Sequence, residues 1–143
     1  MNETAGNLSI RACRLEDIEG VLGIWRQADA TPSVTDTADD LRRATADSPA
    51  HVLVAEVEGR VIGSIIGTFD GWRGNIYRLA VHPEHRRQGI AGALVSEVEK
   101  RLIRQGAKRI TALVEKDQPR AMNFWEAVGY GVDERIARRV RNL

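Results

Sequence analysis

Apolar positions follow two different spacings along this 143-residue chain. Where they recur every three or four residues they predict amphipathic helices, which we expect over 17–28, 37–46, 88–105 and 118–128. Where they alternate or run on, rich in β-branched residues, they predict strands over 8–13, 51–57, 60–68, 75–81 and 110–114, with a loose closing strand or pair over 130–140. The interleaving of the two patterns predicts a mixed α/β sheet, and not a dinucleotide-binding fold built from successive parallel units.

The order of these elements predicts how the strands pair. Three strands follow one another between residues 51 and 81, the first two joined by a turn at Glu58-Gly59, so we expect antiparallel hairpins there. The strand–helix–strand unit over 75–114 predicts a right-handed crossover between parallel strands. The expected fold class is therefore mixed α/β (α+β): a mostly antiparallel central sheet with one parallel β-α-β crossover and helices on both faces. We expect one domain over 1–143, with residues 1–7 frayed.

Alternation along the strand 75–81 predicts which of its side chains share a face. Ile76, Arg78 and Ala80 should point to one side of the sheet, and Tyr77, Leu79 and Val81 to the other. The helices 17–28, which includes Trp25, and 88–105 each carry one apolar stripe, so both should pack against the core.

Composition and charge narrow the function classes. The chain has 21 Lys and Arg against 20 Asp and Glu, a formal net charge of +1, whereas nucleic-acid binders usually show a larger basic excess. No apolar run approaches the roughly 18 residues needed to cross a bilayer, and no signal-peptide apolar region lies near Met1. We therefore expect a cytoplasmic protein with neither nucleic-acid nor membrane partners. The lone Cys13 should be a small core residue, and His51, His82 and His85 lack metal-ligand spacing, so we expect no metal.

The junction between the strand 75–81 and the next helix carries the strongest chemical signal. The strand ends at Pro83, the helix begins near Gln88, and small residues (Gly89, Ala91, Gly92) occupy its start. A helix start has unpaired backbone N–H groups and a partial positive charge, which favour acidic side chains. Here the neighbours are instead basic, namely His85, Arg86 and Arg87. This arrangement is explained if an anion, most simply a phosphate, completes the site.

Two motifs in this part of the chain resemble those of a known family. The pattern Val81-x-Pro83-x-x-Arg86-x-x-Gly89-x-Ala91 resembles the acyl-CoA signature of the GNAT superfamily of N-acetyltransferases, in its small single-domain bacterial form. The pattern Ala121-x-x-Phe124-Trp125-Glu126-x-x-Gly129-Tyr130 is similar to that family's second motif. The resemblance implies the acyl-CoA N-acyltransferase fold and an enzyme that moves an acetyl group from acetyl-CoA to a primary amine of a small molecule, peptide or protein.

The resemblance also implies how the co-substrate would be held. The backbone amides of Arg87, Gly89, Ala91 and Gly92 would cradle the pyrophosphate, and the strand edge at Leu79 and Val81 would pair with the pantetheine arm. The amide of Leu79 would face the thioester carbonyl and stabilise the developing oxyanion. The residues expected at this site are Leu79, Ala80, Val81, Arg86, Arg87, Gln88, Gly89, Ile90, Ala91, Gly92, Asn123, Phe124 and Trp125.

The catalytic groups are less well defined by the sequence. The candidate general base is Glu115, at the end of the strand 110–114, acting directly or through a water, with Asp70 and Tyr77 as alternatives. The family often has a Tyr that protonates the leaving thiolate where this chain has Trp125, so solvent or Tyr130 would have to substitute. This departure keeps a second hypothesis open, a non-catalytic acyl-CoA-binding sensor.

The acceptor amine has no motif of its own. The resemblance places acceptor recognition in the loop 28–37, the turn 69–74 and the closing strands. Four acidic residues in or beside that loop hint at a cationic acceptor, although they serve equally as helix caps and solvated surface: Asp29, Asp36, Asp39 and Asp40. An exposed final strand would also allow a homodimer.

Overall fold

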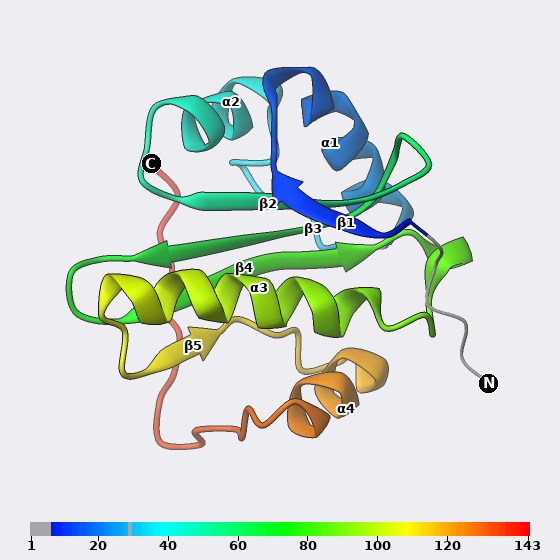
Figure 1. Ribbon diagram of the computed structural model, residues 1–143. Helices are drawn as coiled ribbons and strands as arrows, with labels where there is room; N and C mark the ends of the chain where they lie inside the picture. Colours follow the sequence, from blue (N-terminus) through cyan, green and yellow to red (C-terminus); the bar gives the residue numbers. More distant parts are fainter. Residues whose placement is uncertain (1–6, 29) are drawn as a thin grey trace.

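The computed structural model describes residues 7–28 and 30–143, and its centre is a five-stranded sheet with helices on both faces (Figure 1). The strands lie side by side in chain order: β1 Ser9–Ala12, β2 His51–Val57, β3 Arg60–Phe69, β4 Gly74–Val81 and β5 Ile110–Ala112. All neighbours pair antiparallel except β4 and β5, which are parallel and joined through a helix. The expected fold class is confirmed.

The helices begin and end close to the expected residues. They are α1 Ile18–Gln27, preceded by a 3-10 turn over Leu15–Asp17, α2 Ala38–Ala46, α3 Ile90–Gln105 and α4 Pro119–Ala127. The Thr37 side chain caps α2 by accepting from the N–H of Asp40, and Gly106 ends α3 at a φ of +111°. No helix in the described chain is long and apolar enough to span a bilayer.

Two apolar cores, one on each face of the sheet, hold these layers together. Along β2, Leu53 and Ala55 pack toward α3, while Val52 and Val54 pack toward α1 and α2, as period-two alternation requires. The apolar stripe of α3 lies close to β3. A Cβ added at Gly67 of β3 would overlap the Val98 side chain of α3, so glycine permits this close approach. The buried Cys13 and Trp25 belong to the core beneath α1 and α2, as expected.

A β-bulge interrupts β4 near its C-terminal end. Its register against β3 leaves Arg78 and Leu79 opposite the single residue Ile65. Arg78 adopts a φ of +54°, in the left-handed region that a residue with a Cβ seldom occupies.

The bulge overturns one expectation. Ile76 packs in the core beneath α3, but Ala80 packs in the core beneath α1 and α2, and the guanidinium of Arg78 lies 5.3 Å from the ring centroid of Trp25 on that second side. The prediction that Ile76, Arg78 and Ala80 share a face was wrong, because one extra residue in a strand shifts the later side chains to the opposite face.

The pairing of β4 with β5 stops halfway along β4. Ladder partners run from Gly74 and Ile110 to Ile76 and Ala112, and the N–H of Leu113 then donates to the carbonyl of Ile76 at 3.2 Å. Beyond that bond β4 continues to Val81, and no strand of the described residues pairs with it on this side. The two parallel strands therefore separate and leave an edge of β4 open.

The chain after α4 departs from the expected closing strand. Residues 130–143 form no strand, and β5 is shorter than the strand expected over 110–114. In Figure 1 this last segment, coloured red, passes behind the sheet toward α2. Its residues are mostly exposed, including Ile136 at 70% and Val140 at 72%, so few buried contacts hold it in a ladder. The homodimer remains a prediction, without a final strand in the described chain to support it.

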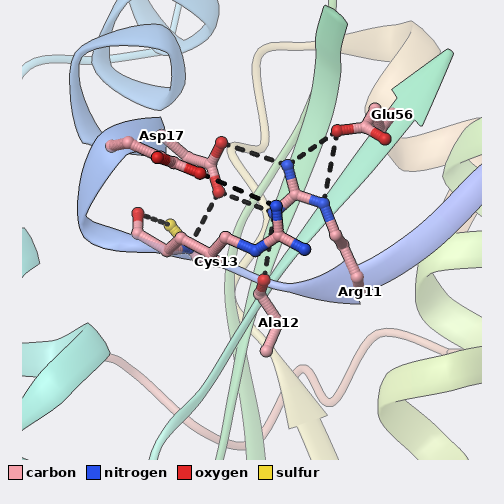
Figure 2. A network of polar contacts seen from close by, with 7 residues as sticks. Arg11, Ala12, Cys13, Asp17 and Glu56 are labelled. Carbon is pink, nitrogen blue, oxygen red and sulfur yellow. Dashed lines mark hydrogen bonds and ion pairs between the residues drawn. The ribbon is translucent and has the colours of Figure 1, made fainter. Parts of the chain in front are cut away.

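A network around Arg11 joins β1 to the start of α1 (Figure 2). The guanidinium of Arg11 donates to both carboxylate oxygens of Asp17, at 2.7 and 3.1 Å, and to Glu56 Oε1 of β2 at 2.8 Å. The backbone N–H of Arg14 also donates to Asp17 Oδ2, at 2.8 Å. Hydrogen bonding with Arg11 lowers the pKa of Asp17, and the same contact raises the pKa of Arg11.

Candidate active site

A cleft of about 1570 Å³ opens where β4 and β5 separate. Its walls come from the loop between α1 and α2, part of α2, the end of β4, the connection into α3, the residues that follow β5, and α4. Arg138 and Val140 of the last segment also line it. The free edge of β4 and the start of α3 meet in this cleft, and the two elements also follow each other in the sequence.

The connection from β4 to α3 has a backbone shaped to receive an anion. A short 3-10 turn over Pro83–His85 follows β4, and Arg87 and Gly89 then take left-handed φ values of 64° and 77°. Left-handed residues interspersed before a helix turn successive N–H groups toward a common concave space. Arg87 holds this conformation although it has a Cβ, which typically costs of order 1–3 kcal/mol and marks functional sites.

The start of α3 is open to an approaching group. A Cβ added at Gly89 or Gly92 would meet no atom within 4 Å. The first turn contains no acidic residue, and Arg86 and Arg87 line the cleft beside it. Free first-turn N–H groups, a positive helix end and basic side chains are features that favour the binding of an anion.

Two buried polar atoms without a partner among the described residues lie next to this connection. His85 Nδ1 and Gln88 Oε1 lie out of contact with water, and neither has a hydrogen-bond partner within the part of the chain that the structure describes. His85 also lines the cleft, so a ligand bound there would be in position to partner its Nδ1, whereas Gln88 does not line the cleft.

The structure brings most of the expected site residues into one cleft. Leu79, Ala80, Val81, Arg86, Arg87, Gly89, Ile90, Ala91, Gly92, Glu115, Phe124 and Trp125 line it. Gln88 and Asn123 do not line it, and Asn123 is an exposed residue of α4.

The three candidates for the base are placed very differently. Glu115 and Tyr77 both line the cleft. Glu115 Oε1 accepts the backbone N–H of Thr31 at 3.1 Å, which orients the carboxylate. Asp70 lies outside the cleft, in the turn before β4, where its Oδ1 accepts the N–H groups of Trp72 and Arg73. Those bonds, that of Arg73 first, lower the pKa of Asp70, so its role is to hold a turn.

Tyr130 does not reach the cleft, so the alternative that gave it the role of proton donor was wrong. Its hydroxyl donates to Glu99 Oε2 of α3 at 2.7 Å, in a separate hollow beside β5. Burial, together with that bond to Glu99, raises its pKa above the usual value of a tyrosine. Trp125 is buried at 6% exposure between the rings of Phe124 and Tyr130 and forms part of the cleft wall.

The acidic residues expected to attract a cation have local partners instead. Asp29 lies outside the described residues, and the carboxylates of the other three are held as follows: Asp36 by Arg78, Asp39 by Arg42, and Asp40 by the hydroxyl of Thr37 and by Arg43. The hint of a cationic acceptor is thereby weakened, because each described charge is balanced within the protein.

Arg78 is a cleft residue that the sequence reasoning missed, and Thr31 is one that it placed only within the loop 28–37. Both line the cleft, and the side chain of Arg78 bonds to the carbonyl oxygen of Thr31 across the space between β4 and the loop after α1. An arginine among the apolar residues of β4 was the available signal, but period-two alternation assigned it to the wrong face.

Metal chemistry has no obvious site in the part of the chain that is described. No three or more His, Cys, Asp or Glu side chains gather there as ligands would.

Comparison with known proteins agrees with this geometry. A family model described as "Acetyltransferase (GNAT) family" matches residues 20–130. The chain is 38% identical over 129 residues to Acetyltransferase SG1711 of Sodalis glossinidius. This alignment covers 90% of the present chain and 91% of that protein. It is also 38% identical over 123 residues to Acetyltransferase ECA0875 of Pectobacterium atrosepticum, covering 86% and 87%. The solved structure of PaiA N-acetyltransferase from Thermoplasma acidophilum in complex with coenzyme A shares the fold, with a TM-score of 0.79 at 19% identity over 90% of this chain and 92% of that one.

Proposed function

The chain belongs to the acetyltransferase (GNAT) family, and on that premise we propose that it transfers an acetyl group from acetyl-CoA to a primary amine by direct attack within a ternary complex. The observation that carries the proposal is the left-handed backbone at Arg87 and Gly89, at the open start of α3 and beside the unpaired edge of β4. Such a backbone suits the diphosphate of acetyl-CoA, and the strand edge suits its amide-bearing arm.

The reaction that we propose needs close positioning more than covalent help from the protein. A neutral amine attacks the thioester carbon, the carbonyl oxygen becomes negative, the carbon–sulfur bond breaks and the thiolate leaves. A backbone N–H at Leu79, on the free edge of β4, would donate to the developing oxyanion.

Glu115 is our candidate for the group that removes the proton from the amine, directly or through a water. It lines the cleft at the end of β5, and one of its carboxylate oxygens is already held by Thr31. Its Oε2 has no hydrogen-bond partner within the described residues, so that oxygen can face the substrate.

In this proposal neither Trp125 nor Tyr130 protonates the leaving thiolate. Trp125 is a hydrogen-bond donor only, and Tyr130 is engaged with Glu99 outside the cleft. Protonation by solvent after departure accounts for turnover, because a thiolate is a tolerable leaving group.

The proposal is tested by thiol release. Purified protein is incubated with acetyl-CoA and a panel of small amines, amino acids and short peptides, and we expect free thiol together with an acetylated product for at least one acceptor. Acetyl-CoA should also raise the melting temperature, as ligand linkage requires. Stabilisation without turnover across a broad panel would favour the acyl-CoA sensor instead.

A single substitution tests the role of Glu115. Glu115→Gln retains an oxygen to accept the N–H of Thr31 but removes the basic group, so the loop should stay in place. We expect kcat to fall roughly 100-fold or more, the usual range for loss of a general base, with unchanged affinity for acetyl-CoA. Wild-type kcat in this variant would exclude Glu115 as the base.

A further inference from the structure

Arg78 makes a set of contacts that neither co-substrate binding nor the amine chemistry explains. Its Nη2 donates to both carboxylate oxygens of Asp36 at 2.8 Å and to the carbonyl oxygen of Thr31 at 2.9 Å. The side chains of Arg78 and Asp36 are each 20% exposed, so these are largely shielded charge-assisted bonds. They join the bulge of β4 to the loop 30–36, which forms one wall of the cleft.

The backbone is bent at Arg78 in a way that makes this reach achievable. Without the bulge, alternation would direct residue 78 to the same side as Ile76, beneath α3. The left-handed φ of 54° instead accompanies a guanidinium that lies over Trp25, on the side of α1. A left-handed conformation is unfavourable for an arginine, so the contacts on that side must stabilise it.

Thr31 is held from both strands that border the opening. Its carbonyl oxygen accepts from Arg78 of β4, and its N–H donates to Glu115, which follows β5. Asp36 in turn accepts the N–H of Ser33 at 3.1 Å, so a second residue of the loop is held by a hydrogen bond. One loop residue therefore bridges the two strands where they separate.

We propose that Arg78 is a positioning residue of the acceptor site. It holds the loop 30–36 in the shape that closes the acceptor half of the cleft, neutralises Asp36 and leaves Glu115 as the carboxylate that faces the amine. This inference rests on the proposed amine acetylation for its kinetic consequence, but not for its structural one. Arg78 acts through the loop, so its loss should affect acceptor binding and not the affinity for acetyl-CoA.

The kinetic test uses Arg78→Gly, because glycine keeps the left-handed backbone of the bulge and removes only the side chain. We expect KM for the acceptor to rise at least about tenfold, as loss of charge-assisted hydrogen bonds implies, with Kd for acetyl-CoA changed by less than about twofold. Arg78→Lys retains the charge but not the planar fork and should recover part of the loss. The control is Arg42→Ala, whose ion pair with Asp39 on α2 is exposed, and which should leave both constants unchanged.

Hydrogen–deuterium exchange tests the same inference without any acceptor. In the wild-type protein the N–H groups of Thr31, Ser33 and Asp36 are bonded, and they should exchange faster in Arg78→Gly and in Asp36→Ala, but not in Arg42→Ala. If the wild-type protein acetylates no amine, the proposed function fails, but this measurement still shows whether Arg78 holds the loop 30–36. Wild-type exchange in Arg78→Gly would overturn the inference, as would an unchanged KM in an active enzyme.

Discussion

Arg11 binds Asp17 at the start of α1, Arg78 binds Asp36 just before the N-cap of α2, and the two clusters have similar local chemistry. The side chains of Arg11 and Asp17 are 17% and 9% exposed, and those of Arg78 and Asp36 are both 20% exposed. The first cluster joins the strands β1 and β2 to the entry of α1 and has no residue in the cleft. The second joins β4 to the loop that leaves α1, and it forms part of the cleft wall. Similar ion pairs thus occur in two places, one away from the cleft and one in its wall.

The largest expected difference between the clusters is in stability. Arg11→Ala leaves the carboxylate of Asp17 without its main partner, and we expect the free energy of unfolding to fall by about 3 kcal/mol, the lower end of the range for breaking a buried pair. Coenzyme affinity of the folded variant should be unchanged. Urea unfolding of Arg11→Ala and Arg78→Gly measures this difference, and we expect the larger loss of unfolding free energy in Arg11→Ala. Equal losses in the two variants would contradict the assignment of the Arg11 cluster to the scaffold.

A second test of the scaffold uses a substitution that changes no charge. Gly67→Ala places a methyl group against Val98, where α3 lies close on β3, and we expect a loss of about 2 kcal/mol from overpacking. Thermal and urea unfolding check this. A variant as stable as the wild type would show that α3 can move away from the sheet at little cost, and would contradict the close approach.

The site has its own matched pair of glycines. Gly89 and Gly59 have φ values of 77° and 78°, and a Cβ added at either would meet no atom within 4 Å. Valine should therefore strain both backbones alike, but only Gly89→Val should obstruct the phosphate site. We expect affinity for acetyl-CoA to fall at least tenfold, about 1.4 kcal/mol, in Gly89→Val but not in Gly59→Val, as measured by calorimetric titration. Equal affinities in the two variants would refute the placement of the diphosphate.

The smallest expected effect is the pH dependence of stability contributed by the Arg11 cluster. The pKa of Asp17 is lowered in the folded protein, chiefly by its hydrogen bonds with Arg11, so its contribution is fully present above the unfolded pKa of ~3.9 and is lost as pH falls toward the folded value. Acid unfolding should therefore be shallower in Arg11→Ala than in the wild type below about pH 4. Parallel curves in that range would mean that Asp17 titrates normally in the fold.

The fold and the open start of α3 could be largely predicted because their signals are local. The turn at Glu58-Gly59, the cap at Thr37 and the small residues at the start of α3 each constrain only their neighbours along the chain. Two motifs in the expected order then placed the free edge of β4 beside that helix.

The remaining features depend on contacts that periodicity does not contain. The bulge at Arg78 depends on pairing with β3, and it reversed the assignment of faces along β4. The prediction that Tyr130 could act as a proton donor failed because its hydroxyl bonds to Glu99. Glu99 lies 31 positions away in sequence, so local patterns do not reveal this contact. The closing strand over 130–140 was wrong because its apolar residues are exposed and pair with no neighbouring strand.

A crystal structure of the protein grown with acetyl-CoA tests the central claim most directly. We predict the diphosphate against the backbone N–H groups between Arg87 and Gly92, and the pantetheine arm along β4 from Leu79 to Val81. A coenzyme bound elsewhere, with the start of α3 closed by the protein's own side chains, would contradict the account.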